Sequence, residues 1–129
     1  MNVVIDASAA VGLTLNLPAA DAFVAPLEQA ELVIAPDLYV AEVCNALWKY
    51  QQAGHLSLPR CELAVEQAMA LPDRLESASA LLVEAFALAC RHRHPVYDAL
   101  YLVLARRTNA VLLTLDRRLA ALAEQLEIK

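Results

Sequence analysis

Val111-Leu112-Leu113-Thr114-Leu115-Asp116 is the clearest strand pattern in the chain, a short apolar run that ends in a carboxylate. The same pattern opens the sequence, where Val3-Val4-Ile5 is followed by Asp6. Short, continuous apolar runs are typical of strands that are buried on both faces of a sheet. We therefore expect Asn2–Ile5 and Val111–Leu115 to be buried strands, each with an aspartate at its carboxyl end.

Between these two runs, helical and strand patterns alternate. Further strands are expected at Glu31–Ala35, at the weakly marked Arg74–Glu76 and as a remnant at Glu127–Lys129. Helices are expected at about Ser8–Leu15, Pro18–Gln29, Leu38–Ala53 after an N-cap at Asp37, Pro59–Leu71, from Ser77 or Ser79 to Arg91, Pro95–Arg107 and Asp116–Leu126. The pattern predicts a single α/β domain spanning residues 1–129, a three-layer sandwich whose central, mainly parallel sheet of four to five strands is flanked by helices.

Composition limits the class of protein. The hydrophobic fraction is 60%, above the usual range of about 45–50%, so the chain can bury a core and retain apolar surface for a partner. No secretory or membrane-spanning segment is expected, because the longest apolar stretch, Ala78–Cys90, is short and contains Glu84. Three cysteines without CxxC spacing, Cys44, Cys61 and Cys90, are expected to be buried and reduced, which favours the cytoplasm.

The charge is unevenly distributed. The net charge of −5 argues against a nucleic-acid partner, but it averages two different regions. Residues 1–90 hold 3 basic and 11 acidic side chains, a net −8, whereas residues 91–118 hold six arginines and two aspartates, a net +4. A local basic patch can bind phosphates on an acidic protein. Arg91, Arg93 and Arg117 are therefore candidates for nucleic-acid contacts, although paired arginines at helix ends are more often simply solvated.

Four acidic residues are expected on one edge of the sheet. Parallel strands place their carboxyl ends at one edge, and the helices that run back against them begin there. Asp6 and Asp116 follow strands, Asp98 lies in the first turn of its helix, and Glu42 lies about one turn into its own. Open α/β sheets bind ligands at this edge. Gathered carboxylates there would form an oxygen site suited to a divalent metal ion.

Each of these acids also has an ordinary structural interpretation. Asp6 and Asp116 could cap the helices that follow them, and Asp98 could complement a helix dipole. Glu42 shares a helical stripe with polar residues at offsets of 3, 7 and 10, which is typical of a solvent-exposed face. Asp98 is the least easily explained, because at offsets of 3 and 4 it shares a face with Tyr101 and Leu102. A carboxylate in that position needs a cation or hydrogen-bond donors to offset desolvation.

Other site chemistries find less support. The sequence has no GxxxxGK[ST] or GxGxxG motif, which argues against nucleotide-phosphate loops. His92 and His94 lack the spacing of paired metal ligands and are expected to be polar loop residues. Ser8 has no convincing histidine partner for a hydrolase triad, and is expected to cap a helix or to bind a metal-bound water.

The motifs resemble those of PIN-domain proteins, in particular the small VapC-type toxins. The resemblance covers nearly the whole chain and is carried by four segments in order: Val4-Ile5-Asp6-Ala7-Ser8-Ala9, the stretch Pro36–Leu47 with Glu42 and Asn45, Tyr97-Asp98-Ala99-Leu100-Tyr101-Leu102-Val103-Leu104-Ala105, and Thr114-Leu115-Asp116. No single segment is specific, and the third is the most distinctive. The weakly marked third strand and the absence of further acids near Asp116 depart from the family pattern, so the number of metal ions stays open.

The resemblance implies a Mg²⁺- or Mn²⁺-dependent endoribonuclease that acts as the toxin of a toxin–antitoxin pair. It implies Asp6, Glu42, Asp98 and Asp116 as catalytic metal ligands, with Thr114 and Asn45 as supporting polar residues. It further implies a homodimer, an RNA substrate and inhibition by a cognate antitoxin protein, with no membrane partner. A PIN-like module that binds RNA or protein without cleaving it is the alternative, because fold does not guarantee activity. Acids and arginines alone also leave DNA open as the substrate.

Overall fold

A computed structural model describes all residues, Met1–Lys129. Its sheet contains β1 (Asn2–Ile5), β2 (Leu32–Pro36), β3 (Arg74–Glu76) and β4 (Val111–Leu113). These four strands are all parallel and lie in the order β3–β2–β1–β4. Val4 in the central strand β1 pairs with Ile34 of β2 and with Leu112 of β4. The register aligns the carboxyl ends of the strands along one edge, as predicted.

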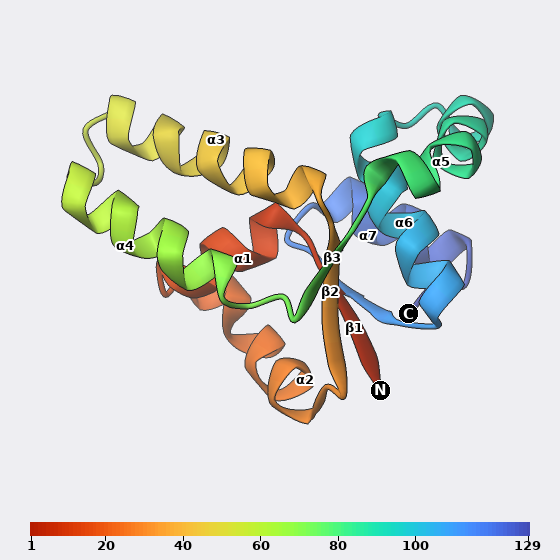
Figure 1. Cartoon of the computed structure of the whole chain (residues 1–129), viewed down its shortest axis with the longest axis horizontal. Helices are drawn as coiled ribbons and strands as arrows, with labels where there is room; N and C mark the ends of the chain where they lie inside the picture. The colour runs from red at the N-terminus through yellow and green to blue at the C-terminus, as the bar shows by residue number, and fades with distance from the viewer.

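Helices cover both faces of the sheet, which confirms the predicted three-layer sandwich. They are α1 (Ala7–Thr14), the 3₁₀ helix η1 (Pro18–Phe23), α2 (Val24–Gln29), α3 (Leu38–Gln52), α4 (Leu58–Met69), α5 (Ala78–His92), α6 (Val96–Thr108) and α7 (Arg117–Gln125). In Figure 1, α1, α3 and α4 lie on one side of the strands, and α5, α6 and α7 lie on the other. The antiparallel pair α3–α4 projects from the body of the domain.

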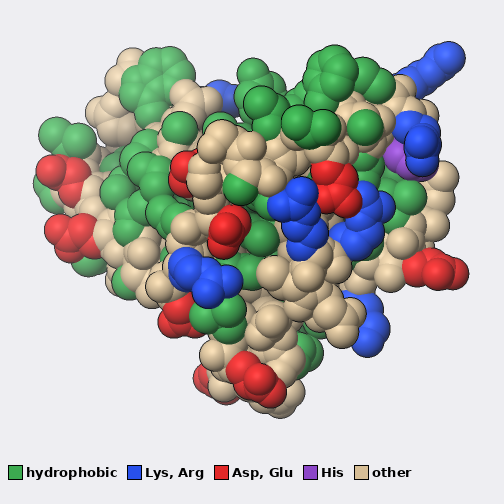
Figure 2. All heavy atoms as spheres, turned by 45° about the vertical axis from the view of Figure 1, so that its right-hand side comes forward, with side chains coloured by type: hydrophobic (Ala, Val, Ile, Leu, Met, Phe, Trp, Pro, Cys, Tyr) green, Lys and Arg blue, Asp and Glu red, His purple; other side chains and the backbone are tan.

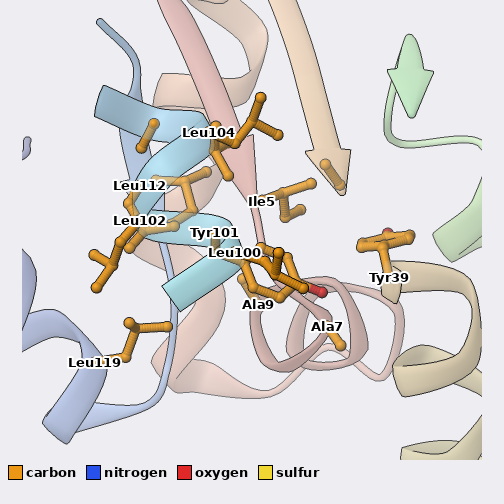
Figure 3. Close-up of a cluster of buried hydrophobic side chains, with 14 of the residues drawn as sticks. Ile5, Ala7, Ala9, Tyr39, Leu100, Tyr101, Leu102, Leu104, Leu112 and Leu119 are labelled. Carbon is orange, nitrogen blue, oxygen red and sulfur yellow. The ribbon is translucent and has the colours of Figure 1, made fainter. Parts of the chain in front are cut away.

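The core is built around α6 and β1. Every residue from Ala99 to Ala105 is buried, so α6 is enclosed by β1, β2, β4 and α5. Leu102 and Ile5 have no exposed surface, and burial of a side chain of this size contributes about 1.5–3 kcal/mol. Figure 3 shows these side chains packed with Tyr101 and Leu104 between the helix and the strands. This packing holds the first turn of α6 at the carboxyl edge of the sheet.

One expected helix is divided and one expected strand is shortened, in both cases because of backbone hydrogen bonding. The helix expected over Pro18–Gln29 is divided into η1 and α2. Pro26 cannot donate a backbone hydrogen bond and is tolerated only in a first turn, so α2 begins anew at Val24. The strand expected over Val111–Leu115 ends at Leu113. Beyond it the Leu115 N–H donates to the Ser8 hydroxyl at 2.9 Å instead of to a neighbouring strand.

The strand remnant expected at Glu127–Lys129 is wrong. Glu127 adopts a left-handed conformation with φ of 58°, and the Ile128 N–H donates to the Ala123 carbonyl at 2.8 Å. This is a helix-terminating arrangement, in which carbonyls without partners at the end of α7 receive donors from the residues that follow. Ile128 is buried, so the end of the chain packs against the domain.

Several side chains differ from expectation. Asp37 stands at the start of α3 but does not cap it, and its Oδ1 atom accepts from the Ala78 N–H at 3.0 Å, at the start of α5. Trp48 is 56% exposed, although a side chain of this size is highly buried on average. Among the three cysteines only Cys61 is buried, because Cys44 and Cys90 lie on the outer faces of α3 and α5.

No single helix is long and apolar enough to cross a membrane. Ala7–Thr14 and Pro18–Gln29 together have the length and composition of a membrane span, but the chain bends by 112° between them.

Candidate active site

Asp6 anchors the site at the end of β1. Its Oδ1 atom accepts from the Ala9 N–H at 2.9 Å, so the predicted cap of α1 is formed. The same oxygen accepts from the Ser8 hydroxyl at 2.7 Å, and the Thr114 hydroxyl donates to Oδ2. Asp6 is only 6% exposed. Its carboxylate is therefore fixed by three donors from two neighbouring strand ends, and the capping and site interpretations are compatible.

Thr114 and Ser8 join the ends of β1 and β4. The Thr114 hydroxyl accepts from the Asp116 N–H at 3.0 Å while it donates to Asp6. Gly12 lets α1 approach this loop closely, because a Cβ atom there would lie 2.7 Å from the Leu115 side chain. The predicted supporting role of Thr114 and Ser8 therefore has a structural basis in the placement of the Asp6 carboxylate.

Asp98 lies in the first turn of α6, as predicted, and its partner is His94. The Nε2 atom of His94 lies 2.9 Å from the Asp98 Oδ2 atom. The His94 side chain is nearly buried, at 4% exposure, while that of Asp98 is 24% exposed. The predicted loop position is correct for His94 and wrong for His92, which is the last residue of α5, and the contact between His94 and Asp98 was not predicted. The only available signal was its position four residues before Asp98.

Glu42 reaches the site from the opposite helical layer. It is half-buried on α3, and the Tyr101 hydroxyl of α6 donates to its Oε1 atom at 2.6 Å. Asn45 and Lys49, on the same stripe of α3, are exposed as expected for a solvent-exposed face. Glu42 is the exception on this stripe because Tyr101 holds it. The sequence did not single out Tyr101 as part of the candidate site, although it shares a helical face with Asp98.

Asp116 is exposed and caps α7. Its Oδ1 atom accepts from the N–H groups of Arg118 and Leu119 at 2.9 and 3.1 Å. The structural interpretation of Asp116 is thus correct, and its charge also reaches the site, where it acts on the pKa of Asp98. We refer to Asp6, Glu42, Asp98 and Asp116 as the acidic edge.

Burial raises the pKa of three carboxyl groups of the acidic edge. Desolvation is the largest cause for Asp6, Glu42 and Asp98, and hydrogen bonds from neighbouring donors lower each pKa only in part. The carboxylates also repel one another: the charge of Asp98 raises the pKa of both Asp6 and Glu42. Apart from His94 beside Asp98, no cationic side chain forms an ion pair with them. Negative charge is therefore concentrated here and is compensated only in part, by His94 and the more distant Arg118 near Asp98.

The acidic edge is an open set of carboxylates and not a preformed metal cage. No group of three or more Asp, Glu, His or Cys side chains is spaced to hold one ion directly. Mg²⁺ typically binds through one or two carboxylates and keeps several waters, so an open set of hard oxygen ligands fits it better than a closed one. The uncompensated charge of Asp6, Glu42 and Asp98 fits a divalent cation by the same reasoning.

The arginines nominated for nucleic acid occupy different surfaces. Arg91 lines a hollow of about 250 Å³ between α5, α6 and α7, and Arg93 and Arg117 are exposed at the ends of helices. Figure 2 brings forward the side of the molecule formed by α5, α6 and α7. Basic side chains lie there on both sides of an acidic one. Arg118, which was not nominated, lies close enough for its charge to lower the pKa of Asp98 in part.

Known proteins resemble this chain in sequence and in fold. The family model described as "PIN domain" matches residues 3–125. The chain is 36% identical to Ribonuclease VapC3 of Pyrobaculum aerophilum over 122 residues, covering 93% of each protein. It is also 36% identical to Ribonuclease VapC3 of Mycobacterium tuberculosis over 118 residues, covering 92% of this chain and 85% of the relative.

Two solved structures resemble it as well. The crystal structure of PAE2754 from Pyrobaculum aerophilum superposes with a TM-score of 0.75 at 26% identity, covering 94% of this chain and 84% of the other. The structure of Mycobacterium tuberculosis VapC20, described as a sarcin-ricin loop cleaving toxin, has a TM-score of 0.68 at 19% identity and covers 92% of this chain and 93% of the other. At that identity the second match supports the fold alone.

Proposed function

The chain belongs to the PIN domain family, and we propose that it is a VapC-type endoribonuclease, the toxin of a toxin–antitoxin pair, acting with Mg²⁺ or Mn²⁺ at the acidic edge. One observation carries the proposal. The carboxyl groups of Asp6, Glu42 and Asp98 gather at the carboxyl edge of a parallel sheet with raised pKa values and, beyond His94, no cationic partner. Such a concentration of charge destabilises the protein unless a cation binds, and this is typical of functional sites.

Asp6, Asp98 and Asp116 would be the principal ligands. A divalent ion held by these residues would supply polarisation of the scissile phosphate and a lower pKa for an attacking water. Ser8 and Thr114 hold the Asp6 carboxylate, and His94 holds that of Asp98, so both ligands are oriented before the ion binds. Buried hydrogen bonds of this kind fix the ligand geometry on which such sites depend.

Glu42 is placed to orient the attacking water or to bind a second ion. The Tyr101 hydroxyl fixes one of its oxygens, and burial raises its pKa, which favours acceptance of a proton. Water attacks phosphorus in line with the leaving 3′ oxygen, and the P–O3′ bond breaks. The products are a 5′-phosphate and a 3′-hydroxyl, and the RNA 2′-hydroxyl takes no part.

The test is cleavage of end-labelled single-stranded RNA by protein treated with a chelator. We expect no cleavage without divalent ion, and cleavage with new 5′-phosphate ends once Mg²⁺ or Mn²⁺ is added. Cleavage that continues in excess chelator would contradict the proposal, as would products that carry a 2′,3′-cyclic phosphate. A single-stranded DNA of the same sequence tests the choice of sugar.

A second candidate is a PIN-like module that binds RNA or protein without cleaving it. The open arrangement of the acidic edge favours it, because no three side chains grip an ion directly. This candidate predicts RNA binding that neither needs divalent ion nor leads to cleavage.

The toxin assignment also implies a homodimer and an antitoxin partner in the cytoplasm. Exposed apolar side chains on α5 and α3 are available for such contacts: Leu82, Val83, Phe86, Val40 and Trp48. Val83 is 85% exposed, which is unusual for an apolar residue without a partner.

A further inference from the structure

A groove of about 360 Å³ runs from the acidic edge along the seam between α1 and α3. Its lining residues are Ala7, Ser8, Glu42, Asn45, Ala46, Lys49 and Tyr50. Ser8 and Glu42 belong to the site described above, so the groove and the acidic edge are continuous. A chain whose phosphodiester lies at the acidic edge can therefore extend directly into this groove.

Lys49 provides a free positive charge in the groove. It lies seven residues beyond Glu42 on the same face of α3, which corresponds to about 10 Å along the helix axis. Its ammonium forms no ion pair. Arg106 and Arg107, in contrast, are both held by Glu84. Lys49 is the sole cationic side chain lining the groove, and it lies about two turns of α3 beyond Glu42, away from the acidic edge.

Tyr50 adds an aromatic surface beside this charge. It is partly buried, and its ring forms an edge-to-face pair with that of His55, with centroids 6.5 Å apart and an interplanar angle of 70°. Gly54 adopts φ of 77°, and the His55 N–H donates to the Tyr50 carbonyl at 3.0 Å, so the turn after α3 fixes the two rings together. An aromatic ring beside a cation is the combination that proteins use to bind single-stranded nucleic acid.

We propose that this groove is a binding subsite for single-stranded RNA adjacent to the cleaved bond. Lys49 binds the phosphate of a nucleotide next to the scissile phosphodiester, and Tyr50 contacts its base. Single-stranded RNA is specified because only an unstacked base can present its face to an aromatic side chain. The proposal rests on the proposed ribonuclease function, and it assigns to Lys49 and Tyr50 a positioning role and no part in the chemistry.

Removal of the Lys49 charge tests the proposal. Binding of a fluorescent single-stranded RNA is measured by anisotropy in chelator, and cleavage is measured with Mn²⁺. We expect Lys49→Gln to weaken binding about fivefold and to raise KM by a similar factor with kcat within about twofold. The plot of log binding constant against log salt concentration has a negative slope, and its magnitude decreases by about 0.7 when one contact to a single-stranded phosphate is lost. Lys49→Arg restores both quantities.

Arg74→Gln is the control for the loss of one exposed positive charge outside the groove; Arg74 lies on β3 at the edge of the sheet, where its Nε atom is 3.7 Å from the Glu76 carboxylate. It is expected to behave as the unsubstituted protein. Tyr50→Phe keeps the ring and should bind normally, whereas Tyr50→Leu should bind about tenfold more weakly while retaining the circular dichroism of the folded protein.

The outcomes separate the two proposals. If Lys49→Gln binds and cleaves RNA as Arg74→Gln does, the subsite is overturned while the ribonuclease proposal stands. A loss of kcat without a change in KM or binding also overturns it. If the unsubstituted protein cleaves no RNA but binds it in a Lys49-dependent manner, the groove remains an RNA-binding site, but the ribonuclease proposal fails and with it the placement of the groove beside a cleaved bond. If it neither binds nor cleaves RNA, both fail.

Discussion

Two regions of this molecule place carboxylates in opposite electrostatic environments: Glu84 is paired with arginines, and three carboxylates of the acidic edge are desolvated by burial. On the outer surface of α5 and α6, Glu84 accepts from Arg106 at 2.8 Å and from Arg107 at 2.9 Å, and the hydrogen bond from Arg106 is the largest cause that lowers its pKa. At the acidic edge, burial raises the pKa of Asp6, Glu42 and Asp98. Glu84 is thus compensated within the chain, whereas the acidic edge is not.

The difference separates a carboxylate that stabilises the fold from carboxylates that are candidates for a functional site. Glu84 is a third exposed and joins two helices that already pack together, so it completes an interface. The acidic edge draws its residues from four places, the end of β1, α3, α6 and the start of α7, and their negative charge is balanced only in part, by His94 and Arg118 near Asp98. A fold gains no stability from ionised carboxylates in such a place, which points to a requirement that lies outside the chain itself.

The largest expected effect is the loss of cleavage on neutralising one acid of the acidic edge. Asp98→Asn should lower the cleavage rate by about a thousandfold or more, since metal ligands contribute several kcal/mol of transition-state stabilisation. The thermal unfolding temperature of the metal-free variant at neutral pH should stay the same or rise, because a carboxylate disfavoured by burial is gone. Unfolding of the variant under these conditions would instead indicate a structural role.

A smaller loss is expected from the residue that orients Asp98. His94→Leu removes the imidazole at about constant volume and should lower cleavage about 10- to 100-fold. Because the hydrogen bond from His94 lowers the pKa of Asp98 in part, its removal should move the acidic limb of the pH–rate profile to higher pH. A variant with reduced rate but an unchanged pH profile would contradict this assignment.

The two regions should respond oppositely to pH in metal-free protein. The raised pKa values of Asp6, Glu42 and Asp98 mean that the folded state binds more protons than the unfolded state above the ordinary values of 3.8 and 4.5. Their contribution to stability is complete below those values and is lost as pH rises through the raised pKa values. The lowered pKa of Glu84 gives a contribution that is present above 4.5 and is lost as pH falls.

Unfolding temperatures measured from pH 4.5 to 7.5 in chelator check this prediction. We expect the slope against pH to become less negative in Asp98→Asn and to be little altered in Glu84→Gln. Equal slopes in the unsubstituted protein and in Asp98→Asn would show that Asp98 is ionised in the metal-free fold without cost.

The smallest effect is expected at Glu84. Glu84→Gln should leave cleavage unchanged and reduce the free energy of unfolding by about 0–1 kcal/mol, the usual range for partly exposed ion pairs. Chemical denaturation beside a cleavage assay measures both quantities. A loss of cleavage in this variant would remove the distinction between the two regions.

The order of strands and helices was predictable because each strand is a short apolar run and each helix has a clear stop. The parallel arrangement then determined which acids share an edge, without any contact being known. Local competition for hydrogen bonds could not be predicted. Leu115 leaves β4 because its N–H finds the Ser8 hydroxyl, and Glu127 turns left-handed to end α7.

The acids of the site were predictable, but their partners were not. Asp98 in an apolar helical face required an explanation from sequence alone. That His94 would turn back onto it, or that Tyr101 would reach Glu42 across 59 residues, depends on how α5, α6 and α3 pack. The open arrangement of the carboxylates was not predictable for the same reason, since side-chain direction at the acidic edge is determined by these tertiary hydrogen bonds.

Titration of chelator-treated protein with Mn²⁺, followed by calorimetry or electron paramagnetic resonance, tests the central claim most directly. The unsubstituted protein and Glu84→Gln should bind Mn²⁺ with the same affinity, and Asp98→Asn should lose that binding. Failure of the unsubstituted protein to bind Mn²⁺, or equal binding by Asp98→Asn, would contradict the assignment of the acidic edge as a divalent-metal site.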